Sequence, residues 1–261
     1  MENVSMNLNV IANEIYRHQK SAVEMDKIST RYPSITIEDA YKIQEINMEK
    51  ELQDGDQFVG WKMGLTSFAK QQSVGVKQPI YGRLLKSMVI SNEELSLDGL
   101  IHPRVEPELA FLINKKLEGN HVTEQDVWLA TEGIMTAIEV IDSRYKDFSF
   151  NLIDVVADNA SSAKFFLSEQ IYEPNKFQWE KAKVLMKLNG KAVQEGIGSA
   201  VMGNPARSVV ELVKMLHSSG LSIEPGMIVL TGGITEAIHV SHGDSIEVEF
   251  VELGEIDLTV I

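Results

Sequence analysis

The sequence of 261 residues contains no cysteine. This absence excludes disulfides, zinc–thiolate sites, iron–sulfur clusters and a thiol nucleophile. Basic residues are also scarce: 24 Lys and Arg stand against 38 Asp and Glu, and the formal net charge is −14. Because nucleic-acid backbones and anionic lipid surfaces attract basic faces, this charge balance argues against binding to either one.

Long hydrophobic runs are absent as well. No stretch approaches the roughly 20 apolar residues of a membrane-spanning helix. The opening residues, MENVSMNLNVIANEIYRHQK, alternate polar and apolar side chains and lack the apolar core of a secretory signal. We therefore expect a cytoplasmic protein that is not embedded in a membrane.

No repeat, low-complexity tract or flexible linker divides the chain. Helical periodicity covers Leu8 to Met25 and Ile37 to Leu52, and Thr36 is a suitable N-cap for the second helix. Two later helices are predicted, one starting at Thr123 and one between Asn204 and Gly220. We expect an N-terminal helical part over residues 1–57 and a catalytic core over 58–261, joined as one continuous structural unit.

Short strand-like runs dominate after Gln57. They include FVGWKMGL, SMVI and the segment Arg104–Ile113, and the chain end from Ile246 is expected to fold back around Gly254. Asn189-Gly190 between two alternating runs predicts a type I′ hairpin turn. Helices followed by many short strands indicate an α+β fold with a curved mixed or antiparallel sheet, not a βαβ repeat.

A pair of glutamates marks the first candidate site. Glu106 and Glu108 are two residues apart in a strand-like run, which places both carboxylates on one face with Cα atoms ~7 Å apart. Pro107 between them cannot donate a ladder hydrogen bond, so we expect it at a sheet edge or a bulge. The alternative is a solvated acidic face, where most charged side chains lie.

Glu139 lies between Ile138 and Val140, in a run where a solvated charge is unexpected. A buried carboxylate needs a cation, and either a metal ion or an arginine such as Arg144 could supply it. If Glu139 joins Glu106 and Glu108, the ligands are all oxygen and strongly anionic. That ligand set suits Mg²⁺ or Mn²⁺.

Two further segments carry polar groups. Lys62 has glycines two residues away on both sides and apolar neighbours, so it is either a buried proton donor or acceptor or a surface lysine with a packed stem. The run VVADNASSAKFF contains Asp158, Asn159, Ser161 and Ser162, which could bind a substrate carboxylate or cap a helix.

A glycine pair in TGGITEA follows the strand-like run MIVL. The segment lacks the Lys-Ser/Thr ending of a phosphate-binding loop. Its glycines would still let the backbone approach a ligand closely.

Seven motifs across residues 58–261 together resemble the hydratase and decarboxylase branch of the fumarylacetoacetate hydrolase superfamily. They occur in the order GWKMGLTS, PIYGRLL, HPRVEPELAF, AIEVIDSRY, VADNASS, GNPARSV and TGGIT. The resemblance implies a mixed-β roll core of the superfamily's C-terminal type with an N-terminal helical part. It also implies that Glu106, Glu108 and Glu139 hold Mg²⁺ or Mn²⁺, that Lys62 is catalytic and that Ser161 helps hold the carboxylate of the substrate.

The reaction within this branch depends on Ile80. Hydratases of the branch usually carry Pro-Asp-Phe/Tyr-Gly, whereas this chain has Pro79-Ile80-Tyr81-Gly82. An apolar Ile80 beside the substrate removes a base for water and favours loss of CO₂. The resemblance therefore implies metal-dependent decarboxylation of 2-oxo-3-hexenedioate to 2-hydroxypenta-2,4-dienoate in catechol meta-cleavage.

Two alternatives remain: hydration of 2-hydroxypenta-2,4-dienoate, or a non-catalytic subunit that stabilises a partner enzyme. For the decarboxylase, the resemblance implies a complex with the hydratase of the same pathway. We also expect a homo-oligomer.

Overall fold

The computed structural model describes residues 7–67, 71–72, 76 and 78–261. The first six residues of the expected N-terminal helical part lie outside this description. Three helices follow: α1 (Leu8–Ser21), α2 (Ile28–Arg31) and α3 (Ile37–Gln53). Thr36 and Asp39 form the capping box of α3, as its sequence predicts. The first helix ends four residues earlier than predicted, because Ala22 adopts a left-handed conformation with φ of 50°.

A mixed sheet forms the centre of the molecule. Its strand order is β2-β1-β9-β4-β5-β6, and β10 pairs with the start of β4. Strand β1 runs parallel to β9, whereas β4 and β5 form a long antiparallel pair. The strands are β1 (Phe58–Gly64), β2 (Ile80–Leu85), β4 (Arg104–Ile113), β5 (Thr131–Ile141), β6 (Ser162–Leu167), β9 (Ile228–Leu230) and β10 (Ile238–His239).

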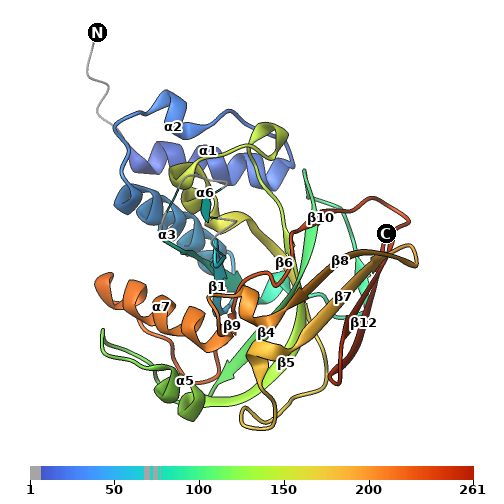
Figure 1. Cartoon of the computed structure of the whole chain (residues 1–261). Helices are drawn as coiled ribbons and strands as arrows, with labels where there is room; N and C mark the ends of the chain where they lie inside the picture. Colours follow the sequence, from blue (N-terminus) through green and yellow to red (C-terminus); the bar gives the residue numbers. More distant parts are fainter. Residues whose placement is uncertain (1–6, 68–70, 73–75, 77) are drawn as a thin grey trace.

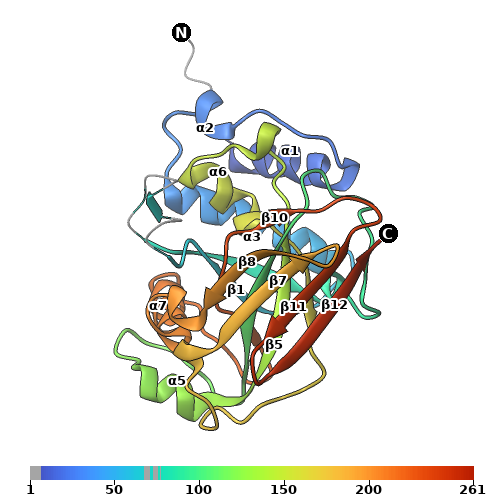
Figure 2. The ribbon, with the colours of Figure 1, turned by 45° about the vertical axis from the view of Figure 1, so that its right-hand side comes forward.

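A second sheet has the order β3-β12-β11-β7-β8 and crosses in front of β5 in Figure 2. Its strands are β3 (Glu94–Leu95), β7 (Lys183–Leu188), β8 (Lys191–Ile197), β11 (Ser245–Phe250) and β12 (Gly254–Val260). The predicted hairpin turn is present, with Asn189 at φ of 53° and Gly190 at φ of 74°. One core cluster joins residues of both sheets, including Val105 and Phe111 with Val184 and Val248, so the sheets pack face to face.

Further helices in the described part of the chain are α5 (Glu124–Ala130), α6 (Leu152–Ala157) and α7 (Pro205–Ser218). Thr123 caps α5 and Asn204 caps α7, which confirms both predicted helices. In Figure 1, α6 lies with α1, α2 and α3 at one end of the molecule, and α5 and α7 lie nearer the other end. Short 3₁₀ turns occupy Lys86–Met88, Lys146–Phe148, Asn159–Ser161, Trp179–Lys181 and Gly198–Ala200.

The α+β class with a curved mixed sheet is confirmed. The predicted strand SMVI is wrong: Ser87 and Met88 belong to a 3₁₀ turn, and Val89 makes only an isolated bridge to Phe165. Met88 and Ile90 are buried, Met88 in the core cluster under β2 and β6, whereas Val89 is 40% exposed. Within the described part of the chain, no helix is long and apolar enough to span a membrane.

The expectation of a bulge or edge at Pro107 is also wrong, since Pro107 pairs with Ile138 in the middle of β4 without a register shift. Its carbonyl accepts from the N–H of Ile234 over 2.9 Å, so its nitrogen faces the segment that joins β9 to β10. This segment makes no regular strand pairing with β4 at Pro107. The missing N–H of proline therefore costs no ladder hydrogen bond.

Candidate metal centre and active-site cavity

The central β4–β5 pair brings three glutamates together. Glu106 stands opposite Glu139 in the ladder, and Glu108 follows on the same face of β4. One carboxylate oxygen from each lies within 4.8 Å of the others. All three side chains are buried, with exposed fractions of 6% for Glu106 and 0% for the other two. The solvated acidic face considered for Glu106 and Glu108 is therefore excluded.

The electrostatics of this cluster call for a cation. Burial raises the pKa of Glu108 well above its usual range, and the neighbouring carboxylates of Glu139 and Glu106 raise it further. Burial also raises the pKa of Glu139 to about 7, although Lys62 acts in the opposite direction. Oε1 of Glu108 and Oε1 of Glu139 have no hydrogen-bond partner among the described residues. Two unpartnered oxygens in an all-oxygen cluster fit a hard divalent ion.

Lys62 on β1 is buried, with 2% of its surface exposed. Its ammonium lies 3.0 Å from Oε2 of Glu139 and donates to the carbonyl of Ala160 over 3.1 Å. The surface alternative for Lys62 is therefore excluded. Arg144, considered as the partner of Glu139, instead forms a buried ion pair with Asp158.

A left-handed turn presents Ser161. Asn159, Ala160 and Ser161 have φ values of 50°, 52° and 57°. The turn is held by the side chain of Asn159, which accepts from the N–H of Arg83 over 2.7 Å and donates to its carbonyl over 2.9 Å. Such a conformation is strained for residues other than glycine. It directs the carbonyl of Ala160 to Lys62 and leaves Oγ of Ser161 without a hydrogen-bond partner among the described residues.

The helix-capping alternative for VVADNASS applies to Asp158 alone, which is the C-cap residue of α6. The side chain of Asn159 bonds β2 instead, and Ser162 begins β6. Burial raises the pKa of Asp158 to about 6, against the lowering effect of Arg144.

The glycine pair predicted to approach a ligand lies at the metal centre. The N–H of Gly232 donates to Oε2 of Glu108 over 2.8 Å. Gly232 has φ of +108°, and a Cβ there would lie 2.2 Å from Oγ1 of Thr66. The sequence did not predict this contact with Glu108. The only local signal for it was a glycine pair directly after a strand.

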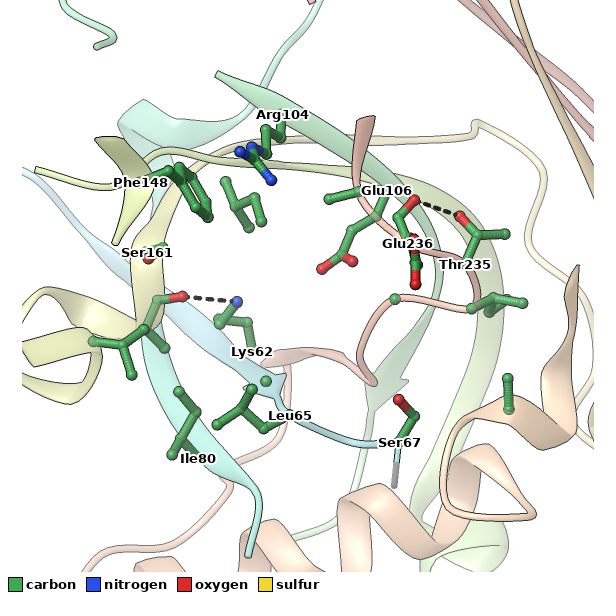
Figure 3. A pocket seen from close by; sticks show the side chains of 18 of the residues that line it. Lys62, Leu65, Ser67, Ile80, Arg104, Glu106, Phe148, Ser161, Thr235 and Glu236 are labelled. Carbon is green, nitrogen blue, oxygen red and sulfur yellow. Dashed lines mark hydrogen bonds between the residues drawn. The ribbon is translucent and has the colours of Figure 1, made fainter. Parts of the chain in front are cut away.

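Of these groups, Lys62, Glu106, Ala160 and Ser161 line a cavity of about 670 Å³. Figure 3 shows Lys62 and Ser161 on one side of it, Glu106 across from them, and Ile80 with Leu65 along another wall. Ile80 is 2% exposed and begins β2. Several further residues line the cavity although no sequence motif indicated them: Arg104, Phe148, Phe150, Gln194, Glu195, Thr235 and Glu236. These residues come from strands and turns that are far apart in the sequence, so no local pattern brings them together.

Comparison with known proteins places this arrangement in a family. The chain is 39% identical over 248 residues to the 4-oxalocrotonate decarboxylase of Pseudomonas sp. strain CF600, covering 94% of each chain. It is 33% identical over 243 residues to the 2-hydroxyhexa-2,4-dienoate hydratase of Comamonas testosteroni, covering 92% of each.

Its fold superposes on the 4-oxalocrotonate decarboxylase of Pseudomonas putida G7, solved with magnesium and adipate. The TM-score is 0.96 at 34% identity, with 99% of this chain and 100% of that chain covered. The family model for the fumarylacetoacetate (FAA) hydrolase C-terminal region matches residues 63–261. With its β4–β5 carboxylate cluster inside the matched region, the chain belongs to the fumarylacetoacetate hydrolase C-terminal family.

Proposed function

We propose that this protein is a metal-dependent decarboxylase that converts 2-oxo-3-hexenedioate to 2-hydroxypenta-2,4-dienoate and CO₂. The observation that carries the proposal is the buried cluster of Glu106, Glu108 and Glu139 with the Lys62 ammonium beside it. Glu106 and Lys62 line a cavity large enough for a small diacid. The relatives named 4-oxalocrotonate decarboxylase support the choice of reaction.

Glu106, Glu108 and Glu139 would hold Mg²⁺ or Mn²⁺, and the ion would supply Lewis-acid polarisation of the C2 carbonyl of the substrate. Each of the three glutamates contributes oxygen, the donor that both ions prefer. No thiamine or pyridoxal is needed, because the C2 carbonyl conjugated with the C3–C4 double bond already accepts the electron pair.

Lys62 donates the proton that completes the reaction. When the C5–C6 bond breaks, C6 leaves as CO₂, and its electron pair forms the C4–C5 double bond. The C3–C4 pair moves to C2–C3, and the C2 carbonyl pair moves onto oxygen. The ammonium of Lys62 then donates a proton to this oxygen and is recharged from solvent. The carbonyl of Ala160, at 3.1 Å, keeps the Lys62 side chain aimed from β1 into the site.

Ser161 and Ile80 act on the substrate rather than on the metal. Oγ of Ser161 is a free donor at the cavity wall, suited to the C1 carboxylate. Ile80 forms an apolar wall with Leu65 and Val155. It offers no base to activate a water molecule, which is the reason for preferring decarboxylation over hydration.

The second candidate function is hydration of 2-hydroxypenta-2,4-dienoate. It is favoured by the 33% identity to the hydratase from Comamonas testosteroni. Incubation of the purified protein with Mg²⁺ or Mn²⁺ and each substrate separates the two reactions. We expect CO₂ from 2-oxo-3-hexenedioate, measured by coupled assay, and little consumption of the dienoate. The reverse pattern would replace the proposal by the hydratase.

A chelator-treated sample and Glu106→Gln serve as controls. Both should lose CO₂ release if the glutamates hold the ion. If Glu106→Gln retained full activity in an assembly with a partner enzyme, the chain would be a non-catalytic subunit instead.

Partners follow from the product, which is the substrate of a hydratase. We therefore propose a complex with such a hydratase and a homo-oligomer of this chain. Size-exclusion chromatography with light scattering, with and without the hydratase, tests both assemblies. A monomer that does not change on mixing would refute them.

A further inference from the structure

We propose that Arg104 binds the second carboxylate of the substrate and so makes this site selective for 2-oxo diacids over 2-oxo monoacids. The inference deepens the proposed function, because it takes the 2-oxo acid end of the substrate to lie at the glutamate cluster. It assigns a residue to the other end of the cavity, for which no sequence motif predicted a binding group.

Strand β4 relates the two ends. Arg104, Glu106 and Glu108 alternate along the strand and therefore share one face. Their burial decreases along it: Glu108 is fully buried, Glu106 is 6% exposed, and Arg104 is half-buried. A ligand anchored at the glutamates and extended along this face reaches Arg104 next.

The spacing suits a six-carbon diacid. Adjacent same-face positions on a strand are ~7 Å apart. Three extended backbone bonds span about 3.5 Å, so the five C–C bonds between the two carboxyl carbons of such a diacid span about 6 Å. One terminal carboxylate can therefore lie at the metal centre while the other reaches the guanidinium of Arg104.

The guanidinium is held without a charged partner. It stacks over the ring of Phe148, with Cζ 4.1 Å from the ring centroid. Among the described residues Arg104 forms no ion pair, and its buried Nε has no hydrogen-bond acceptor. Figure 3 shows Arg104 and Phe148 together at one wall of the cavity. A stacked, planar and unpaired guanidinium is suited to bidentate binding of a carboxylate.

The charges of the cavity point to the same position. Among its described lining residues, only Lys62 and Arg104 are basic. A divalent ion and the ammonium of Lys62 balance the three glutamates, which leaves Arg104 for the substrate. Glu195 and Glu236 also line the cavity, and Glu236 lies beyond Glu106, away from Phe148. A second carboxylate would be repelled on that side and attracted to Arg104.

Pairing with Arg104 exists in the bound substrate and is lost as neutral CO₂ leaves. It therefore contributes to binding and alignment more than to the chemical step. Removing the guanidinium should raise KM for the diacid strongly and change kcat less.

The test compares two ligands that differ only in the second carboxylate, 2-oxoadipate and 2-oxohexanoate. Neither has the C3–C4 double bond that the proposed decarboxylation needs, so titration calorimetry with Mg²⁺ measures binding without turnover. We expect the wild-type protein to bind 2-oxoadipate ~10- to 100-fold more tightly than 2-oxohexanoate. Arg104→Met should abolish this preference by weakening 2-oxoadipate alone.

Arg104→Lys keeps the stem and the charge but not the planar fork, and it should retain part of the preference. If Arg104→Met does not fold, the Arg104→Lys variant serves as the test of whether the guanidinium sets the preference. The matched control is Arg207→Met, which removes an exposed arginine that pairs with Glu124 and should leave the preference unchanged.

The inference is overturned if wild type shows no preference, if Arg104→Met keeps it, or if both ligands weaken equally. Failure of the proposed function gives a different result: an Arg104-dependent preference in a protein that releases no CO₂ from 2-oxo-3-hexenedioate.

Discussion

The ammonium of Lys62 lies 3.0 Å from Oε2 of Glu139, and the two side chains are 3% and 0% exposed. A buried ion pair of this kind is weakly stabilising as a pair, but loss of one partner leaves the other charge uncompensated. The proposed proton donor is thus also part of the charge balance of the proposed metal centre, and the two roles can be separated by measurement.

Lys62→Met should reduce kcat by roughly 10²- to 10⁴-fold, because the dienolate oxygen loses its proton donor. At pH 8 without metal it should also lower the free energy of unfolding by about 3–5 kcal/mol, because Glu139 loses its cation and must either stay an uncompensated buried charge or bind a proton. Urea unfolding with and without Mg²⁺ checks this. Mg²⁺ should restore much of the stability but not the activity. Lys164→Met is the control, since Lys164 donates to the carbonyl of Ser87 and belongs neither to the glutamate cluster nor to the cavity lining.

Glu108→Gln should separate metal binding from folding. The amide oxygen can still accept the N–H of Gly232, and the variant loses a carboxyl group whose pKa is raised by burial. We expect the metal-free variant to be at least as stable as metal-free wild type at pH 8. At Mg²⁺ one hundred times its Kd, wild type should gain about 2.7 kcal/mol, and the variant almost nothing. An equal gain in both proteins would remove Glu108 from the ligand set.

The stability of the metal-free protein should fall as pH rises. Folding raises the pKa of Glu139 from 4.5 to about 7, so between these values the folded state keeps a proton that the unfolded state has lost. The resulting stabilisation is complete below pH 4.5 and is lost as pH passes about 7. Mg²⁺ replaces this proton, so its stabilising effect should grow over the same window. Denaturant midpoints between about pH 5 and 8 measure both trends. Glu139→Gln should reduce them, and the raised pKa values of Glu108 and Asp158 account for the remainder.

Gly232→Ala should weaken the metal centre through the backbone. The new Cβ would lie 2.2 Å from Oγ1 of Thr66 and force the N–H of Gly232 away from Glu108. Gly226→Ala is the matched control: Gly226 has φ of +88° and open space around its Cβ position. The control should lose only about 1–2 kcal/mol from left-handed strain and keep its Mg²⁺ affinity. Gly232→Ala should lose more stability and also affinity, as measured by Mg²⁺ titration. Equal behaviour would show that the Gly232 contact does not matter.

Local patterns in the chain were sufficient for the helices and the hairpin. Thr36, Thr123 and Asn204 cap helices because capping depends on residues within one turn. Asn189-Gly190 forms its turn for the same reason, since both residues tolerate positive φ. The run SMVI failed as a strand because its first residues, Ser87 and Met88, belong to a 3₁₀ turn, which leaves only an isolated bridge from Val89 to Phe165 of β6.

The sequence by itself determined that Glu106 and Glu108 share a face, because strand alternation is local, and that Glu139 needs a cation, because its neighbours are apolar. Only the tertiary structure decided which cation stands nearest. The β4–β5 register sets Glu139 opposite Glu106, the pairing of β1 with β2 and β9 brings Lys62 to Glu139, and Arg144 is taken by Asp158. The position of the Arg104 guanidinium depends on the turn that carries Phe148, because the Phe148 ring lies against it at the start of β4. Such contacts join residues distant in the chain, and their geometry depends on strand register and packing, which no local pattern encodes.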